Sequence, residues 1–230
     1  MKKISFIVLA LCTSAAVFSQ NAQPQLVTPM AKATRFGIRG GVNLADLTAK
    51  NLASGSMYTE AQSKTGFNGG IFVNIPIGSK NFRFQPELSY SSQGGKLQGP
   101  SGTTTATTYE QDLDYINLPL NFQLMSNNGF FIQTGPQLGF LVGAEKSTTS
   151  STSGSSNGGG NKEDFDKLDF SWTGGVGYLT RFGLGLDLRY NIGIANVVAD
   201  DASATAPLKG GTWKNSVGQF SLIYHFGASK

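Results

Sequence analysis

The sequence predicts an all-β fold, an eight-stranded antiparallel up-and-down β-barrel that crosses a membrane. Three observations support this prediction. From Arg35 to Phe226 the chain divides into eight runs in which apolar and polar side chains alternate. The connections between the runs are short and long by turns, as they are in transmembrane barrels. Aromatic side chains gather at both ends of the runs, where such a barrel meets the two membrane interfaces.

The first four runs show the alternation clearly. In the first, Phe36 faces one side while Arg35 and Arg39 face the other, which is the pattern of a strand between two different media. The second run has Phe72 as its apolar exception on the polar face. Pro86, in the third, predicts a local bulge or an interrupted hydrogen bond, because proline cannot donate to a ladder. These runs are RFGIRGGVNL (35–44), about Thr65 to Ile77, FRFQPELSY (82–90) and DYINLPLNFQL (114–124).

The last four runs repeat the pattern, with several glycines on the polar face. In the seventh, for example, Leu186 and Leu188 alternate with Asp187 and Arg189. Strands of about nine to twelve residues suit a tilted crossing of the hydrocarbon layer. These runs are FFIQTGPQLGFLV (130–142), LDFSWTGGVGYL (168–179), GLGLDLRYNIGI (183–194) and SVGQFSLIYHF (216–226).

The long connections all follow odd-numbered runs, so they are predicted to share one side of the membrane. Outer-membrane barrels have short periplasmic turns and longer external loops, so we expect the tight turns and both termini in the periplasm. The third long connection is of low complexity from Lys146 to Lys167, with Ser and Gly dominating 146–161, and it is predicted to be a mobile external loop. The long connections are about 45–64, 94–109, 143–167 and 195–215.

The first residues of the chain predict export. Lys2 and Lys3 precede an apolar stretch and then small residues, which is the layout of a secretory signal peptide. The stretch is shorter than the roughly 20 apolar residues that a membrane-spanning helix needs. Cys12 is the single cysteine and lies inside this segment, so the exported chain has no disulfide. The expected parts are a signal peptide at 1–20, a flexible periplasmic leader at 21–34, the barrel at 35–226 and a tail at 227–230.

The composition excludes some classes of protein. Without Lys2 and Lys3 the chain has 16 basic and 14 acidic residues, which gives no electrostatic footprint for nucleic acid. The chain holds 30 Gly and 16 Phe with 14% charged residues. A soluble lipocalin-like barrel or a secreted β-sandwich is the main alternative fold. In such a soluble fold the apolar face would point inward and the other face would meet water. It is disfavoured because that other face has few Lys and Glu to keep it soluble.

The inward parity contains charged side chains that are predicted to form a polar network in the lumen. Eight strands leave an interior just wide enough for side chains to fill it, and buried charges there need partners or water. A salt-bridged plug is the favoured interpretation and a gated polar pore is the alternative. The predicted members of the network are Arg39, Arg83, Glu87, Asp187 and Arg189, with Arg35 also on the inward parity.

No motif in the sequence indicates catalysis or a metal site. His225 is the only histidine, and Ser221 lies too far along an extended strand to act directly as its partner in acyl transfer. Acidic residues gather in the long connections, where a solvated surface that meets divalent ions loosely is favoured over a Ca²⁺ site. These residues are Glu110, Asp112, Asp114, Glu163, Asp164, Asp166, Asp200 and Asp201.

Four segments resemble the PorT-like outer-membrane β-barrel proteins of the Bacteroidota. They are FGIRGGVNLADL in the first run, FQPELSYSSQGGK in the third, DYINLPLNFQL in the fourth and GFFIQTGPQLGFLVGAE in the fifth. The resemblance implies an outer-membrane protein, and its namesake takes part in a secretion and gliding-associated system. It implies no catalytic or ligand-binding residues for this chain.

Taken together, these patterns predict an integral outer-membrane protein with an interaction, structural or secretion-associated role through its external loops and rim. A narrow solute channel and a lipid-modifying enzyme are the alternatives. We expect a monomer without cofactor, metal or catalytic residues. The expected partners are outer-membrane lipids and lipopolysaccharide, the barrel assembly machinery during biogenesis and secretion-system proteins, with no nucleic acid.

Overall fold

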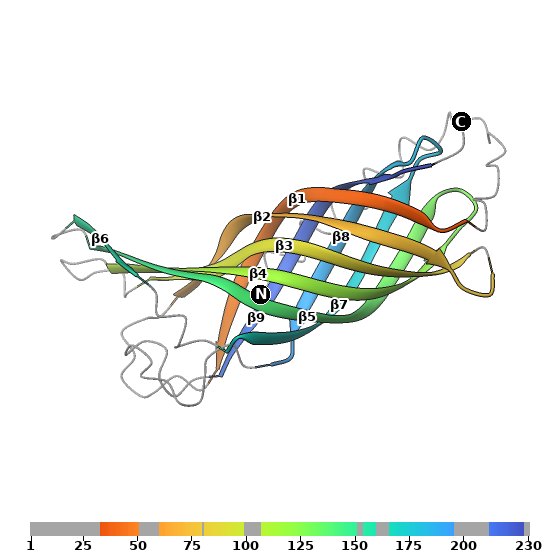
Figure 1. Cartoon of the computed structure of the whole chain (residues 1–230). Helices are drawn as coiled ribbons and strands as arrows, with labels where there is room; N and C mark the ends of the chain where they lie inside the picture. Colours follow the sequence, from red (N-terminus) through yellow and green to blue (C-terminus); the bar gives the residue numbers. More distant parts are fainter. Residues whose placement is uncertain are drawn as a thin grey trace.

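The computed structural model forms a closed β-barrel (Figure 1). It describes residues 33–50, 60–79, 81–98, 107–150, 154–159, 166–195 and 212–227. The predicted signal peptide and most of the predicted leader and tail lie outside these residues. The strands are β1 (Arg35–Lys50), β2 (Glu60–Pro76), β3 (Phe82–Gln98), β4 (Thr107–Met125), β5 (Phe130–Ser150), β6 (Gly154–Gly159), β7 (Leu168–Leu179), β8 (Leu184–Gly193) and β9 (Thr212–His225).

Eight of the strands make the barrel wall, in agreement with the predicted fold. The order β4-β3-β2-β1-β9-β8-β7-β5 closes on itself through the β4–β5 pairing, and each neighbouring pair is antiparallel. The short strand β6 lies outside this ring and pairs with the end of β5. Within the described residues, no helix is long and apolar enough to cross a membrane.

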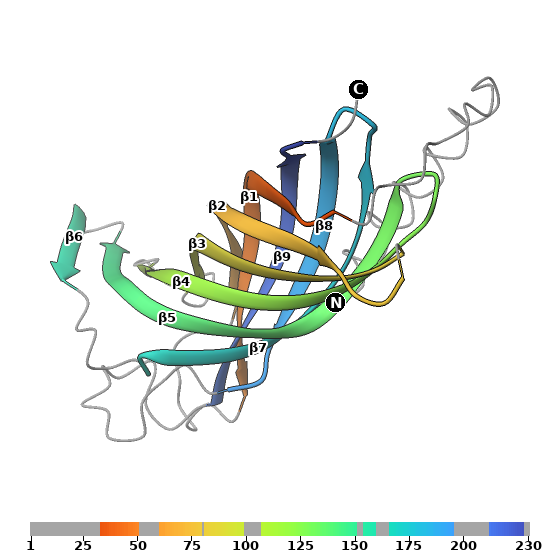
Figure 2. The same ribbon diagram turned by 45° about the vertical axis from the view of Figure 1, so that its right-hand side comes forward.

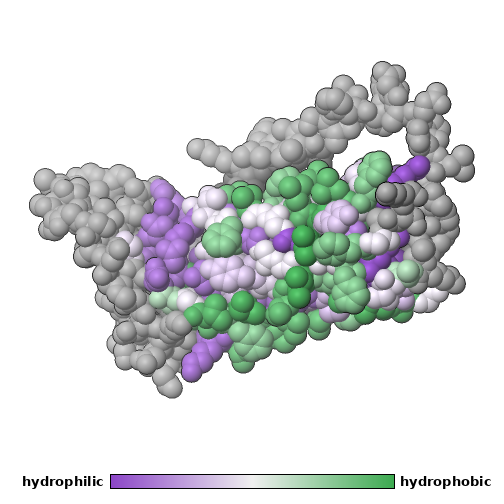
Figure 3. All heavy atoms as spheres, turned by 45° about the horizontal axis from the view of Figure 1, so that its top comes forward, coloured by the Kyte–Doolittle hydropathy of each residue, from purple (hydrophilic) through white to green (hydrophobic). Residues whose placement is uncertain are grey.

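Side-chain burial alternates along the strands as the sequence predicts, with the polar set inside. In β8, Asp187 and Arg189 are buried while Leu186 and Leu188 are exposed. On the face shown in Figure 3, apolar residues cover much of the wall and hydrophilic residues gather toward the end that carries β6. An exterior of this kind is stable in lipid, because apolar side chains lose nothing by facing hydrocarbon.

Tight turns join the strands at one end of the barrel. They connect β2 to β3, β4 to β5 and β7 to β8. The turn between β4 and β5 contains an Asn-Gly pair, and Gly129 has a φ of 95° there. A Cβ at this position would lie 2.3 Å from the carbonyl oxygen of Leu179, so the turn needs glycine for its conformation and for space.

At the opposite end the strands are longer than predicted. β4 and β5 have 19 and 21 residues, so the expected limit of about twelve is wrong for them. Alternation between apolar and polar side chains ends where lipid ends, but backbone pairing continues into water. Part of the predicted Ser- and Gly-rich loop is therefore β structure, because 146–150 belong to β5 and pair with β6.

Beyond the barrel the wall divides into two parts (Figure 2). The ends of β1 and β9 that lie away from the tight turns pair with each other, from Ala45 to Lys50 on β1. The ends of β2, β3, β4 and β5 continue with β6 as a separate sheet, here called the outer sheet. Its segments are 60–64, 94–98, 107–114, 143–150 and 154–159.

Register shifts mark the place where the outer sheet leaves the barrel. One lies between Ser63 and Asn68 on β2, and the other lies between Asp114 and Tyr115 on β4. Such irregularities bend a strand and increase its twist, which suits a change of direction. The register of β3 against both neighbours passes Pro86 without a shift, so there is no bulge at that proline. The pairing is interrupted beside it, at 85–86 against β2 and at 87–88 against β4, which agrees with the predicted alternative of an interrupted hydrogen bond.

Candidate functional site in the barrel lumen

A group of four charged side chains crosses the middle of the lumen. We call it the charge quartet: Arg39 of β1, Glu87 of β3, and Asp187 and Arg189 of β8. Arg39 Nη1 lies 3.0 Å from Glu87 Oε1 and 3.8 Å from Asp187 Oδ2. Arg189 reaches Glu87 Oε2 and Asp187 Oδ2 at 2.9 Å each. Four of the five predicted network residues therefore meet in one cluster.

The charge quartet is electrically balanced and sealed from water. It contains two guanidinium groups and two carboxylates, and each of these side chains is 1% exposed. Arg39 also donates to Ser221 Oγ at 2.8 Å, and Asp187 accepts from Gln133 Nε2 at 2.6 Å. Buried ions with this many partners resist separation, since removing one partner leaves an uncompensated charge.

Arg83, the fifth predicted member, lies apart from the charge quartet. Among the described residues it forms no ion pair, and its guanidinium donates to Asn74 Oδ1 and to the carbonyl oxygen of Ala33, the latter at 2.9 Å. Its link to the quartet is indirect. Asn74 donates to Gln123 (2.7 Å), Gln123 donates to Gln133 (3.1 Å), and Gln133 donates to Asp187.

An apolar layer occupies part of the lumen near the tight turns, beside buried polar side chains such as Asn74 and Gln123. Phe72 and Phe131 lie across from glycines on neighbouring strands, and their rings occupy the space that side chains would take there. A Cβ on Gly37 would lie 2.2 Å from the ring of Phe72, and one on Gly177 would lie 2.2 Å from that of Phe131. The layer, all buried, consists of Phe72, Met125, Phe131, Leu179 and Ile223.

Sequence reasoning noticed Phe72 but missed the layer as a whole. The sequence feature that marks the layer is a pair of adjacent apolar residues in a run, because one member of the pair then faces lipid and the other faces the lumen. Each buried residue follows an outward apolar one in the chain, and the pairs are 71–72, 124–125, 130–131, 178–179 and 222–223. Because the five pairs come from five different strands, their meeting depends on how the strands are staggered.

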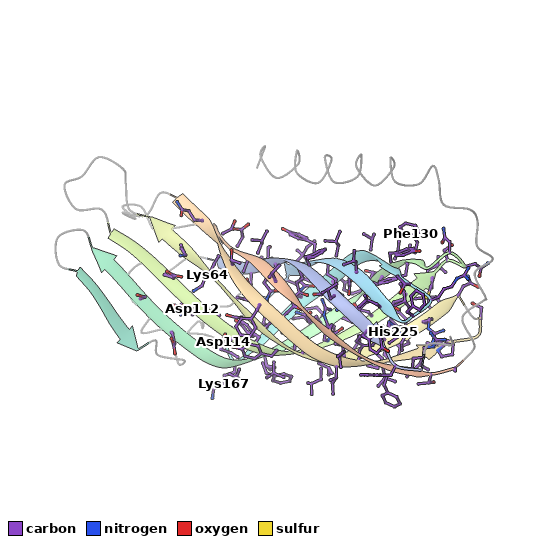
Figure 4. All side chains as sticks on the ribbon, turned by 90° about the horizontal axis from the view of Figure 1, so that it is seen from above. Lys64, Asp112, Asp114, Phe130, Lys167 and His225 are labelled. Carbon is purple, nitrogen blue, oxygen red and sulfur yellow. The ribbon has the colours of Figure 1, made fainter. Side chains whose placement is uncertain are left out.

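A second group of buried nitrogen-bearing side chains lies at this end of the lumen. We call it the basic cluster: Arg35 of β1, Arg83 of β3 and His225 of β9. The ring of His225 packs edge-on against Phe72, with centroids 4.8 Å apart. Figure 4 shows His225 toward one end of the barrel and Lys64 and Asp112 toward the other.

Ser221 and His225 do not form a catalytic pair. The hydroxyl of Ser221 accepts from Arg39 and donates to Asn68 Oδ1 at 2.9 Å. Asn68 in turn donates to Asn43 at 2.7 Å, and Asn43 donates to Ser91 at 2.9 Å. Ser221 therefore belongs to a polar network that adjoins the charge quartet. The side chains that contact its hydroxyl, Arg39 and Asn68, do not provide a general base.

At the outer end, some of the acidic residues are neutralised by lysines. Lys64 of β2 pairs with Asp112 and with Glu110, 2.8 Å away, and Lys96 lies 3.2 Å from Glu110. Burial opposes the charge on Lys64, but its hydrogen bonds to Asp112 and Glu110 raise its pKa above the ordinary value. The hydrogen bond from Lys64 lowers the pKa of Glu110. Of the other predicted acidic residues, Glu163, Asp164, Asp200 and Asp201 lie outside the described residues.

This architecture, with a lipid-facing apolar exterior and a filled polar interior, defines the class of outer-membrane β-barrels. Residues 18–199 match the family model of the outer membrane protein beta-barrel domain. The chain belongs to this family, and it is an outer-membrane barrel protein. No curated protein matches the chain.

Three solved structures of bacterial surface barrels are similar to this chain. Neisserial surface protein A is 12% identical, with a TM-score of 0.44 over 84% of this chain and 99% of that one. Ail, the attachment invasion locus protein of Yersinia pestis, is 11% identical, with a TM-score of 0.46 over 84% and 98%. OprG from Pseudomonas aeruginosa is 13% identical, with a TM-score of 0.41 over 86% and 98%.

Proposed function

We propose that this protein is a closed barrel that serves as an interaction or structural component of the outer membrane and offers no passage for solutes. The observation that carries this proposal is the filled lumen. The charge quartet spans it with ion pairs of 2.9–3.8 Å, and the apolar layer lies between the quartet and the tight turns. An ion that crossed the lumen would have to separate the ion pairs of the charge quartet and lose water beside the apolar layer. Both steps cost free energy.

The outer sheet is the part of the protein best suited to contact a partner. Its strands continue past the barrel, and among the described residues no further strand packs on their faces (Figure 2). Its segments contain Thr, Ser, Gln, Lys and Glu more than apolar residues. Surfaces of this composition bind through hydrogen bonds and charge, while the barrel anchors them.

The proposed orientation puts the tight turns in the periplasm and the outer sheet outside the cell. It is supported by the contrast between short and long connections. Lipopolysaccharide would then surround the outer interface, and the barrel assembly machinery would insert the chain from the periplasm. The resemblance to PorT-like proteins supports a secretion-associated form of this role, with secretion-system proteins as partners and no enzymatic activity.

Site-specific photo-cross-linking in intact cells tests the proposal. A cross-linking amino acid is placed at an outer-sheet position such as Lys96 and, as the matched control, at the lipid-facing position Leu186. We expect discrete protein adducts from the outer sheet and none from the control. The absence of outer-sheet adducts, together with solute uptake that depends on the protein, would favour a transporter instead.

A further inference from the structure

The basic cluster has no compensating charge among the described residues. Arg35 is 8% exposed, Arg83 0% and His225 1%, so all three are buried. Within the described part of the chain, neither arginine forms an ion pair with a carboxylate. Among the described residues, Arg35 Nε, Arg83 Nη1 and His225 Nδ1 also lack a hydrogen-bond partner. Such orphaned groups are rare in stable proteins, because each one costs free energy.

Strand register brings these three side chains together. Arg35 lies directly across from Asn74, whose side-chain oxygen accepts from Arg83. His225 lies across from Gly37, two residues along the same face from Arg35. Diagonal neighbours at this spacing are within reach of long side chains.

The surrounding residues hold the cluster in place. Arg83 is fixed by Asn74 and by the carbonyl of Ala33, and Asn74 is fixed by its bonds to Gln85 (2.8 Å) and Gln123 (2.7 Å). Phe72 supports the ring of His225. The remaining donors are thus preorganised, which lowers the entropy cost of binding a ligand.

We propose that the basic cluster binds a phosphate group at the end of the lumen that carries the tight turns. Two guanidinium groups match the charge of a phosphate dianion better than that of a single carboxylate. Their planar donor forks also suit phosphate oxygens. The phosphate belongs either to a free anion or to a lipid headgroup, since the chemistry is the same. This site is independent of the proposed role of the outer sheet.

The test uses the full exported chain in two settings. In detergent micelles, inorganic phosphate is titrated against the protein by calorimetry, with acetate as the comparison anion. In phosphatidylcholine nanodiscs with and without phosphatidic acid, retained lipid is counted by native mass spectrometry. Binding of inorganic phosphate at one site per chain assigns a free anion. Retention of phosphatidic acid without binding of inorganic phosphate assigns a lipid headgroup.

Two variants and a matched control make the test specific. Arg35→Gln and Arg83→Gln are expected to weaken binding by about tenfold to a hundredfold, the usual loss for a hydrogen bond to a charged group. Arg181→Gln removes the same charge from an exposed residue at the same end of the barrel, and it is expected to leave binding unchanged. Heat-modifiable gel migration checks that each variant is folded.

Three results would overturn the proposal. The first is no binding in either setting, and the second is acetate binding as tightly as phosphate. The third is an equal loss of binding in Arg181→Gln, which would indicate unspecific attraction to positive charge.

Discussion

The lumen contains two buried groups of charged side chains, and they differ in charge balance. The charge quartet pairs two arginines with two carboxylates. The basic cluster combines two arginines and a histidine, and no described carboxylate pairs with them. Both groups lie in the same barrel, and the apolar layer lies beside the basic cluster. We therefore propose two uses for buried charge here: the balanced group closes the lumen, and the unbalanced group binds an anion.

The largest expected effect comes from unbalancing the charge quartet. Glu87→Gln leaves Arg39 and Arg189 facing a single carboxylate, that of Asp187. We expect the free energy of unfolding to fall by about 3–5 kcal/mol, as it does when one partner of a buried ion pair is removed. Urea unfolding in detergent micelles, followed by gel migration, measures this loss.

A charge-balanced double variant provides the control for Glu87→Gln. Adding Arg189→Gln leaves one arginine and one aspartate, so the double variant should be more stable than Glu87→Gln alone. If the second substitution only adds to the loss, charge balance does not explain the stability of the quartet.

The next largest effect concerns the apolar layer. Phe72→Ala removes a buried ring that fills the space beside Gly37. We expect a loss of about 3 kcal/mol, the usual cost of a cavity left by phenylalanine. The same unfolding assay applies, and Phe36→Ala on the lipid-facing side of β1 is the control. Equal losses in the two variants would mean that the layer is not a packed core.

Arg35→Gln tests whether the basic cluster lacks a balancing charge. Since this substitution removes a repelling charge from the basic cluster, we expect stability in phosphate-free buffer to stay within about 1 kcal/mol of the wild type or to rise. A loss as large as that of Glu87→Gln would show that Arg35 has a stabilising counter-charge.

The smallest effect is expected at the outer sheet. The folded pKa of Glu110 lies below its ordinary value of 4.5, so its stabilisation is present above that pH and is lost as the pH falls through the folded pKa. The folded pKa of Lys64 is raised, so its contribution is lost only at strongly alkaline pH. We expect less than about 1 kcal/mol, because the pair is partly exposed. The protection factors of the β2 and β4 amides, which are corrected for the slower intrinsic exchange in acid, should fall as the pH is lowered, and Glu110→Gln should abolish this dependence.

The barrel wall could be predicted because side-chain parity in a strand does not depend on the rest of the fold. Phe36, Leu186 and Leu188 face outward as their positions require, and Arg39 and Asp187 face inward. Four members of the predicted network could be found for the same reason. The resemblance of four segments to a known barrel family agreed with the family that the chain belongs to, at the level of the outer-membrane barrel.

The arrangement inside the lumen could not be predicted, because it depends on stagger between strands. Parity alone puts Arg83 in the lumen, but the register decides that it meets Asn74 and not Glu87. The apolar layer and the outer sheet could not be predicted from side-chain parity either. Phe131 shares its parity with the polar Gln133, so parity does not separate the apolar layer from the polar lumen. The alternation also ends where the membrane ends, so it does not show how far the polar parts of the strands stay paired in water.

The most direct test of the central claim is the conductance of the wild-type protein in planar lipid bilayers. A lumen closed by the charge quartet and the apolar layer predicts a silent membrane, with no steady openings at any applied voltage that the bilayer tolerates. Steady ohmic openings of uniform size, present with the wild-type protein and absent from a mock preparation, would contradict the closed barrel.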